Sequence, residues 1–262
     1  MRILITNDDS ISSPVLLPLI QWASQLGEVT CVVPKYEQSG KSHSIELHKA
    51  YEVLKVTLAP DIDIYTVDSS PADCVRYAFL GLNQSFDLVI SGINKGMNLG
   101  IDMIYSGTVG AIFEAACFDV PAVALSTVPD TFDAALANLD TVKDFFIEHK
   151  LLKKNLLYNV NIPVNPKGIR ITRQGGRYYS DDYLPQENNM VMPKGKPVFA
   201  PSGNPELDTD AVLQDGCISI SPLTLCRTDM GVWVRERLLV MAFCPALWSR
   251  WELFLLFWRH GS

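Results

Sequence analysis

The sequence predicts an α/β fold: a three-layer, Rossmann-like domain with a mostly parallel sheet and a hairpin or extended-arm subdomain toward the C-terminus. Two observations carry this prediction. Up to about residue 162, short runs rich in Val, Ile and Leu alternate with longer amphipathic stretches, as in β–α–β units. From about residue 163, Pro, Gly and Asn become frequent and the apolar runs shorten, which indicates hairpins.

The individual elements follow from this alternation. Strands are expected at 2–6, 28–33, 51–57, 62–67, 87–90, 122–126 and 156–162. Helices are expected at 14–26, 72–82, 106–118 and 130–150, and shorter strands at 168–172, 196–200 and 217–221. Pro14 suits a first helical turn, and Gly27 ends that helix. Parallel strands joined by helices imply right-handed crossovers, with helices on both faces of the sheet.

The chain divides into three regions by composition. Residues 1–162 form the predicted α/β core, and 163–224 form a hairpin or arm with a late strand, which we interpret as a dimerisation element. Residues 225–262 form an atypical tail that contains four of the five tryptophans. Its apolar run is interrupted by Pro245, Arg250 and Glu252, which argues against a membrane span. We expect this tail to be packed or covered by a partner.

Composition excludes several functional classes. The 262 residues are 48% hydrophobic, enough for a full core, and the net charge of -7 argues against binding to a nucleic acid polymer. The six cysteines include no CxxC pair, so we expect buried thiols in a reducing compartment. The N-terminal stretch has no basic start followed by an apolar run and cleavage site. A cytoplasmic protein is therefore expected.

Two adjacent carboxylates, Asp8 and Asp9, follow the first predicted strand. In open α/β sheets, ligands bind outside the carboxyl ends of the strands, so this pair could hold a hard divalent cation. Asp and Asn also commonly cap helices and form turns. From this segment alone, both interpretations remain open.

Three further segments follow predicted strands. In the loop 34–44, Gly40-Lys41-Ser42 resembles the end of a P-loop, but position 35 is Lys where a glycine is required, so a P-loop is rejected. The loop 91–100 has three glycines and two asparagines, which permit close backbone approach and supply neutral oxygens. The small-residue helix start at 105–110 is a natural anion site, although ordinary N-capping by Ser106 would also explain it. Together with the carboxylates, the loop 91–100 and this helix start describe a metal–phosphate site.

The motifs in this order resemble those of the SurE survival proteins, a family of metal-dependent nucleoside monophosphate phosphatases. The resemblance spans roughly residues 1–224. It is carried by Asn7-Asp8-Asp9, Ser39-Gly40, Ser91-Gly92-Ile93-Asn94, Tyr105-Ser106-Gly107-Thr108-Val109, Pro71-Ala72-Asp73-Cys74-Val75 and the stretch from Gly216 to Leu223.

The resemblance implies a site and an activity. One Mg²⁺ or Mn²⁺ ion would be held by Asp8, Asp9, Ser39 and Asn94. The phosphate would be bound by Asn94, Ser106, Gly107 and Thr108, and Asp8 or Asp9 would act in catalysis. The expected reaction is that of a 5′-nucleotidase, the hydrolysis of nucleoside 5′- or 3′-monophosphates to nucleoside and phosphate. The resemblance also implies a homodimer or homotetramer. His43, although it lies in the second loop, is left out of the catalytic set.

Two departures and two alternatives accompany the resemblance. Ser10 and Val15 stand where the family usually has glycine, and Ser10 could strain the first loop if that position needs a positive φ. The first alternative is a catalytically impaired nucleotide- or phosphate-binding protein of the same fold. The second is an aspartyl-phosphate hydrolase of the haloacid dehalogenase type, whose Asp-x-Asp spacing is missing because position 10 is Ser.

Overall fold

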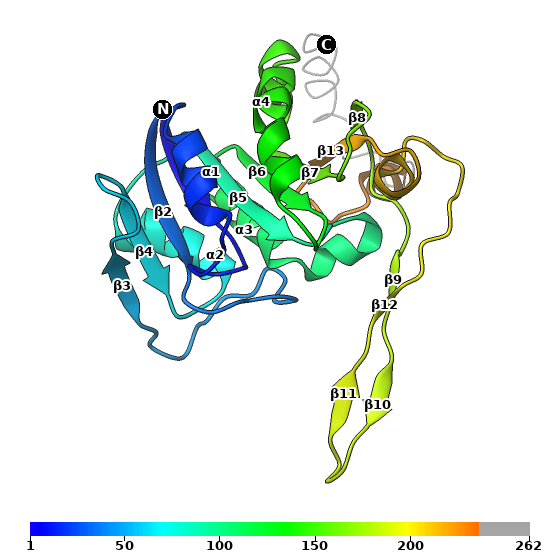
Figure 1. Ribbon diagram of the computed structural model, residues 1–262, viewed down its shortest axis with the longest axis horizontal. Coiled ribbons are helices and arrows are strands. Elements are labelled where there is room, and N and C mark those ends of the chain that lie inside the picture. The colour runs from blue at the N-terminus through cyan, green and yellow to red at the C-terminus, as the bar shows by residue number, and fades with distance from the viewer. Residues whose placement is uncertain (236–262) are drawn as a thin grey trace, which may run out of the picture. The chain divides into compact units, whose positions relative to one another are not determined.

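The computed structural model describes residues 1–235, and the chain divides into two compact units, Met1–Thr224 and Leu225–Ser262. The first unit contains a nine-stranded sheet in the order β3-β4-β2-β1-β5-β6-β7-β13-β8 (Figure 1). The apolar run of the tail and Cys244 lie outside the described residues, so the prediction of a packed tail stays a prediction. Among residues 1–235, no helix has the length and apolar character needed to cross a membrane.

The strands and helices alternate along the chain as the sequence predicts. The strands are β1 (Arg2–Thr6), β2 (Glu28–Pro34), β3 (Val53–Val56), β4 (Asp63–Val67), β5 (Leu88–Lys95), β6 (Ala122–Thr127), β7 (Leu157–Ile162), β8 (Ile169–Ile171), β9 (Tyr179–Ser180), β10 (Tyr183–Pro185), β11 (Val191–Pro193), β12 (Lys196–Pro197) and β13 (Ile218–Leu223). The helices are α1 (Leu16–Ala23), α2 (Pro71–Arg76), α3 (Gly107–Cys117), α4 (Asp133–Glu148) and α5 (Leu151–Lys154). Short π-helical segments η1 (Tyr77–Gly81) and η3 (Asp210–Gln214) and a 3₁₀ helix η2 (Gly100–Tyr105) complete the described elements.

Strand directions place a topological switch point between β1 and β5. The strands β4, β2, β1, β5, β6 and β7 are mutually parallel, whereas β3 and β13 pair antiparallel with β4 and β7. The chain builds outward from β1 to β2 and β4, then returns to the other side of β1 as β5. Ligands bind at the carboxyl ends of strands where the order reverses in this way. The ends of β1 and β5 are therefore the expected position of a site.

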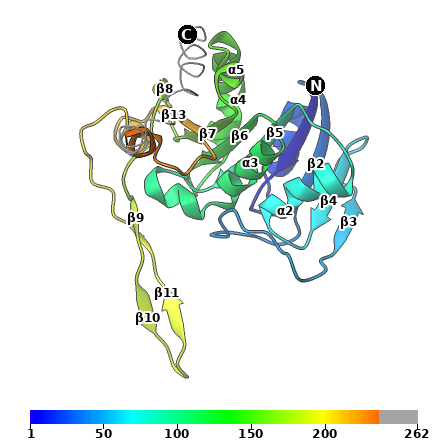
Figure 2. The ribbon, with the colours of Figure 1, turned by 180° about the vertical axis from the view of Figure 1, so that it is seen from behind.

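Helices cover both faces of the sheet, which confirms the predicted α/β architecture. One apolar core lies between the sheet and the helices α1, α4 and α5, and includes Leu19, Leu139 and Phe146. A second core lies under α2 and α3 and includes Val75 and Ile112. Figures 1 and 2 show these two helical layers from opposite sides. The sheet is thus buried on both faces, as its nearly continuous apolar strands require.

Residues 163–224 contribute both to the sheet and to an extended arm. The strands β8 and β13 add to the edge of the central sheet beyond β7. Between them, β9 pairs with β12 and β10 with β11 as antiparallel ribbons that lead away from the sheet (Figure 1). The predicted hairpin strands are therefore present, although the ribbons are shorter than the strand predicted at 196–200.

Two predictions need correction. The strand predicted at 87–90 continues to Lys95, because the backbone resumes pairing with β6 after a register shift between Ser91 and Asn94. The first half of the predicted loop 91–100 is therefore strand. The cysteines are not uniformly buried: among the described residues Cys31 and Cys74 are buried, whereas Cys117 and Cys226, at the end of α3 and beyond β13, are exposed.

Candidate active site

The first loop places its two aspartates differently. Asp8 is buried with 4% of its surface exposed, and its Oδ1 accepts a hydrogen bond of 2.7 Å from the Thr108 hydroxyl. Asp9 is partly exposed, and its Oδ2 accepts a 3.0 Å bond from the backbone N–H of Lys95. One carboxylate is therefore joined to the start of α3 and the other to the end of β5. This arrangement brings together three of the segments that the sequence singled out.

The second loop approaches the same point through its backbone. The N–H of Gln38 donates to the carbonyl of Asp8 at 2.8 Å, which places Ser39 beside the first loop. Ser39 is exposed, and its hydroxyl donates to Glu37 Oε1 at 2.7 Å. Because the Ser39 hydroxyl lone pairs still face solvent, this side chain can serve as an oxygen ligand.

Asn94 lies on β5 rather than in a loop. It is half-buried next to the register shift of that strand, opposite Ser126 of β6. Its Nδ2 donates to the carbonyl of Gly96 at 2.8 Å. This bond fixes the orientation of the amide and leaves Oδ1 as the atom that can accept or ligate.

The start of α3 forms the anion-binding end of the site. Ser106 is the N-cap, and its Oγ accepts the N–H of Val109 at 3.1 Å. A Cβ on Gly107 would lie 3.1 Å from the Cβ of Asp8 and 3.3 Å from Asp8 Oδ2. The helix start therefore lies directly against the first carboxylate, with no side chain between them. Free backbone N–H groups and the helix dipole favour a bound phosphate at this point.

Burial controls the electrostatics of the two aspartates. Desolvation, reinforced by the nearby charge of Asp9, raises the pKa of Asp8 from 3.8 to about 6, in spite of the Thr108 hydrogen bond that lowers it. The pKa of Asp9 is also raised, first by desolvation and then by Glu37, against the lowering effect of the Lys95 N–H. Two neighbouring carboxylates under these conditions favour either a proton or a bound cation.

The donor set fits a hard divalent cation. Asp8, Asp9, Ser39 and Asn94 offer carboxylate, hydroxyl and amide oxygens, which are the ligands preferred by Mg²⁺ and Mn²⁺. No cluster of three or more His, Cys, Asp or Glu residues with metal-binding geometry occurs in the described part of the chain. That result fits a site in which neutral oxygens supply half of the protein ligands. The buried Oδ1 of Asn7, next to this set, has no hydrogen-bond partner within residues 1–235.

Sequence reasoning missed the buried polar contacts that support the site. Asn98 is held by two strand residues: its N–H donates to Asn161 Oδ1 at 2.8 Å, and its carbonyl accepts from Asn159 Nδ2 at 2.7 Å. Asp208 accepts the N–H groups of Gly100 and Gly175, at 3.0 and 2.8 Å. These contacts fix the segment between β5 and α3 on β7 and on the root of the arm. The Asn-x-Asn pattern of β7 was the available signal, since polar residues in a buried strand need partners.

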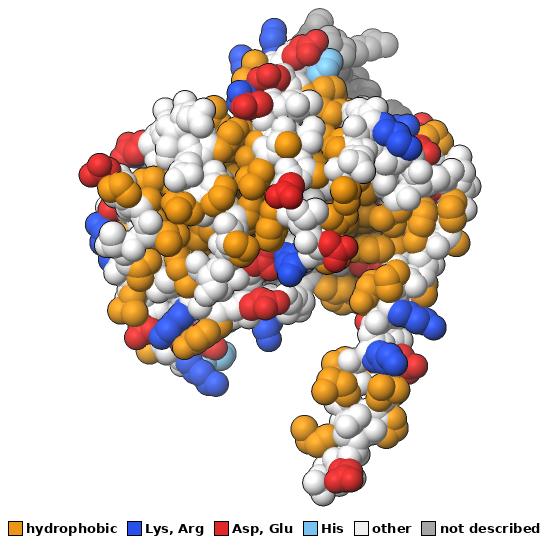
Figure 3. Space-filling view, viewed as in Figure 1, with side chains coloured by type: hydrophobic (Ala, Val, Ile, Leu, Met, Phe, Trp, Pro, Cys, Tyr) orange, Lys and Arg blue, Asp and Glu red, His pale blue; other side chains and the backbone are white. Residues whose placement is uncertain are grey.

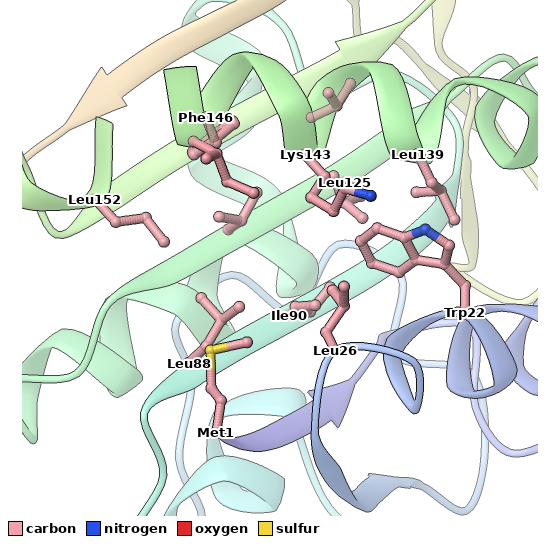
Figure 4. A pocket seen from close by; sticks show the side chains of 13 residues that line it. Met1, Trp22, Leu26, Leu88, Ile90, Leu125, Leu139, Lys143, Phe146 and Leu152 are labelled. Atoms are coloured by element: carbon pink, nitrogen blue, oxygen red, sulfur yellow. The ribbon is translucent and has the colours of Figure 1, made fainter. Parts of the chain in front are cut away.

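The apolar cavity of about 320 Å³ on the α1/α4 face is not part of this site. Figure 4 shows Trp22 and Leu26 facing Leu139 and Phe146 across it. Met1 and Leu88, which also line it, lie at the amino ends of the strands, whereas the aspartates follow the carboxyl end of β1. Among residues 1–235, Lys143 is the single lining residue with a charged side chain, so these residues offer no carboxylate for phosphate hydrolysis.

Comparison with known proteins agrees with this geometry. The family model described as "Survival protein SurE" matches residues 3–181. This chain belongs to the SurE family. It is 38% identical over 245 residues to the 5′-nucleotidase SurE of Thermoanaerobacter sp. (strain X514), covering 88% of this chain and 95% of that protein. It is 35% identical over 242 residues to the 5′-nucleotidase SurE of Legionella pneumophila subsp. pneumophila, covering 87% and 92%.

A solved SurE structure shares the fold. The crystal structure of the SurE protein from Aquifex aeolicus superposes with a TM-score of 0.72 at 31% identity, covering 91% of this chain and 99% of that one.

The backbone conformation distinguishes the two departures from the SurE pattern. Ser10 has a φ of +72°, in the left-handed region that favours glycine, whereas Val15 has a φ of -86°, which any residue adopts. Of these two departures, only Ser10 is therefore subject to backbone strain.

Proposed function

We propose that this SurE protein is a divalent-metal-dependent phosphatase that hydrolyses nucleoside 5′-monophosphates to nucleoside and phosphate. The observation that carries the proposal is the 2.7 Å bond between Thr108 and Asp8, which joins the carboxylate pair to a helix start suited to an anion. The names of the relatives, 5′-nucleotidase SurE, support the reaction and the 5′ position. The proposal extends to nucleoside 3′-monophosphates.

The metal would be one Mg²⁺ or Mn²⁺ ion held by Asp8, Asp9, Ser39 and Asn94. When bound, such an ion lowers the pKa of a coordinated water and neutralises charge on the phosphoryl oxygens. The protein fixes its ligands beforehand: the Lys95 N–H occupies Asp9 Oδ2 and leaves Oδ1 free, and the Gly96 carbonyl orients the Asn94 amide. This preorganisation reduces the cost of assembling the site.

The remaining residues bind the phosphate and handle the proton. Ser106, Gly107 and Thr108 would receive the phosphoryl oxygens at the start of α3, with the Asn94 side chain on the opposite side. Asp8 Oδ1 is occupied by Thr108, whereas Oδ2 lies beside Gly107. We therefore assign to Asp8 Oδ2 the task of orienting the attacking water and accepting its proton.

The extended arm is proposed to join copies of the chain into a homodimer or homotetramer. Its hairpin exposes large apolar side chains, with Met190 at 65%, Tyr183 at 62% and Val191 at 58% exposed (Figure 3). An apolar hairpin of this kind, extended into solvent, is typical of an interface element. A double Tyr183→Ser, Val191→Ser variant should lower the mass measured by sedimentation. An unchanged mass would refute the role of the arm.

We also propose a cytoplasmic location.

The direct test is phosphate release from a panel of nucleoside 5′- and 3′-monophosphates. Turnover should require Mg²⁺ or Mn²⁺, stop with chelator, and be lost in Asp8→Asn and Asn94→Ala. Asp144→Asn, an exposed carboxylate on α4, is the matched control and should retain wild-type turnover. Turnover that persists in chelator would refute the metal mechanism. Nucleotide binding without any turnover would instead favour the catalytically impaired alternative.

A further inference from the structure

The second loop, which in the structure spans residues 35–52 between β2 and β3, is held against α3 and the residues just before it. The backbone N–H of Ser42 donates to the carbonyl of Tyr105 at 2.9 Å, and its hydroxyl donates to the carbonyl of Ile104 at 2.6 Å. A Cβ on Gly110 would lie 2.4 Å from the carbonyl oxygen of Ser42, so the loop and the helix touch through their backbones. These contacts hold the loop that carries Ser39 against the helix start that would bind phosphate.

One side-chain contact extends this attachment farther along α3. His43 Nε2 lies 2.7 Å from Glu114 Oε2, and Glu114 is buried with 5% of its surface exposed. Burial alone would raise the pKa of Glu114, but hydrogen bonds and charges from His43 and Arg76 outweigh it and hold that pKa below its ordinary value. An ionised carboxylate can only accept, so His43 Nε2 carries the hydrogen of this bond.

The Glu114 carboxylate also connects α3 to α2, and α2 in turn contacts the second loop. Glu114 Oε1 accepts from Arg76 Nη1 at 3.2 Å. Three residues earlier on α2, Asp73 Oδ2 accepts the backbone N–H of Glu46 at 2.8 Å. The second loop is therefore attached to α3 through His43 and to α2 through Glu46, which closes a continuous polar circuit. Such circuits hold a segment more firmly than separate bonds do.

We propose that His43 is a positioning residue that, through Glu114, fixes the second loop so that Ser39 is held at the metal site. This inference rests on the proposed function, because it takes Ser39 as a metal ligand. Ser39 is exposed, and among the residues that the structure describes its hydroxyl bonds only within the loop, to Glu37. Its place is therefore set by its neighbours, Gln38 on one side and Ser42 with His43 on the other. Loss of the His43 contact should weaken metal binding while leaving the phosphate-binding residues in place.

Manganese binding measured by isothermal titration calorimetry tests this inference. His43→Ala should raise the Kd for Mn²⁺ about tenfold, the usual cost of removing a residue that orients a metal ligand. His43→Gln can still donate from Nε2 to Glu114 and should bind close to wild type. His48→Ala, an exposed histidine on the same loop, is the matched control and should bind as wild type does. At saturating Mn²⁺, kcat and KM of His43→Ala should approach wild-type values.

Hydrogen exchange of the metal-free protein provides a second readout. Amides of residues 37–46 should exchange faster in His43→Ala, whereas those of β1 and α4 should not. If His43→Ala does not fold, Glu114→Gln, which keeps an acceptor but loses the charge, should show a smaller shift of the same sign. Unchanged Mn²⁺ affinity and unchanged exchange in His43→Ala would overturn the inference. Wild-type protein that binds no Mn²⁺ would instead refute the proposed function, so the two failures are distinguishable.

Discussion

The raised pKa of Asp8 predicts that this carboxyl destabilises the metal-free protein as the pH rises. Asp8 is almost fully buried, and its pKa is raised from 3.8 to about 6, chiefly by desolvation. Well below pH 3.8, the Asp8 carboxyl is protonated in both the folded and the unfolded state, so it does not change the free energy of unfolding. As the pH rises toward 6, the unfolded chain ionises first while the folded chain keeps its proton. Folding therefore becomes less favourable through this range, and the full cost applies above it.

The magnitude follows from the size of this pKa shift. One pKa unit corresponds to about 1.4 kcal/mol, so the shift costs the folded state about 3 kcal/mol above pH 6. Asp8→Asn removes the ionisation, and its amide oxygen can still accept the Thr108 hydrogen bond. In chelator at pH 8, Asp8→Asn should therefore be more stable than wild type by up to about 3 kcal/mol. At pH 3.5 the difference should approach zero.

Urea unfolding at a series of pH values, followed by circular dichroism in chelator, measures this difference. Asp144→Asn serves as the control, since it removes an exposed carboxylate on α4 and should not change the pH dependence. Added Mn²⁺ should stabilise wild type more than Asp8→Asn, because metal binding compensates for the buried charge. If Asp8→Asn were no more stable than wild type at pH 8, the argument from desolvation would be refuted.

Three further substitutions test individual contacts of the site. Ser10→Gly should stabilise the protein by about 1 kcal/mol in urea unfolding and increase turnover, because the φ of +72° favours glycine; equal stability and turnover would show that Ser10 is not strained. Gly107→Ala should sharply lower kcat/KM in the phosphate-release assay, since the added Cβ would lie 3.1 Å from the Asp8 Cβ and the Pro71 Cγ. Wild-type kinetics in this variant would contradict the close approach. Thr108→Val should raise the pH below which Mn²⁺ binding is lost, because the Thr108 hydrogen bond lowers the pKa of Asp8. If that pH were unchanged or lower, the result would argue against the bond.

The sequence was sufficient to predict the sheet and to place the candidate-site segments at the carboxyl ends of its strands. Buried strands are continuous apolar runs, and polar residues such as Asp8 and Ser39 mark the positions where they end. Asn94 was placed in a loop because Ser91-Gly92 looks like the end of a strand. The backbone instead resumes pairing with β6 after the register shift. Local sequence cannot reveal such a shift, because it depends on the neighbouring strand.

Contacts between distant residues were beyond the reach of sequence patterns. His43 and Glu114 are separated by 71 positions, and Gly100 and Asp208 by 108, with no periodicity that relates the members of either pair. The sequence indicates a surface or structural role for His43 but not its partner, which in the structure is a buried carboxylate on α3. The strain at Ser10, in contrast, was predictable, because a glycine usually occupies that position in the family and a positive φ explains the preference.

Anomalous diffraction from crystals soaked with Mn²⁺ and inorganic phosphate tests the central claim most directly. The account predicts a single strong manganese peak bound by oxygens of Asp8, Asp9, Ser39 and Asn94, with phosphate density at the N-terminus of α3. Asp8→Asn crystals treated in the same way should lose the peak. A manganese peak elsewhere on the protein, or phosphate bound away from Ser106–Thr108, would contradict the account.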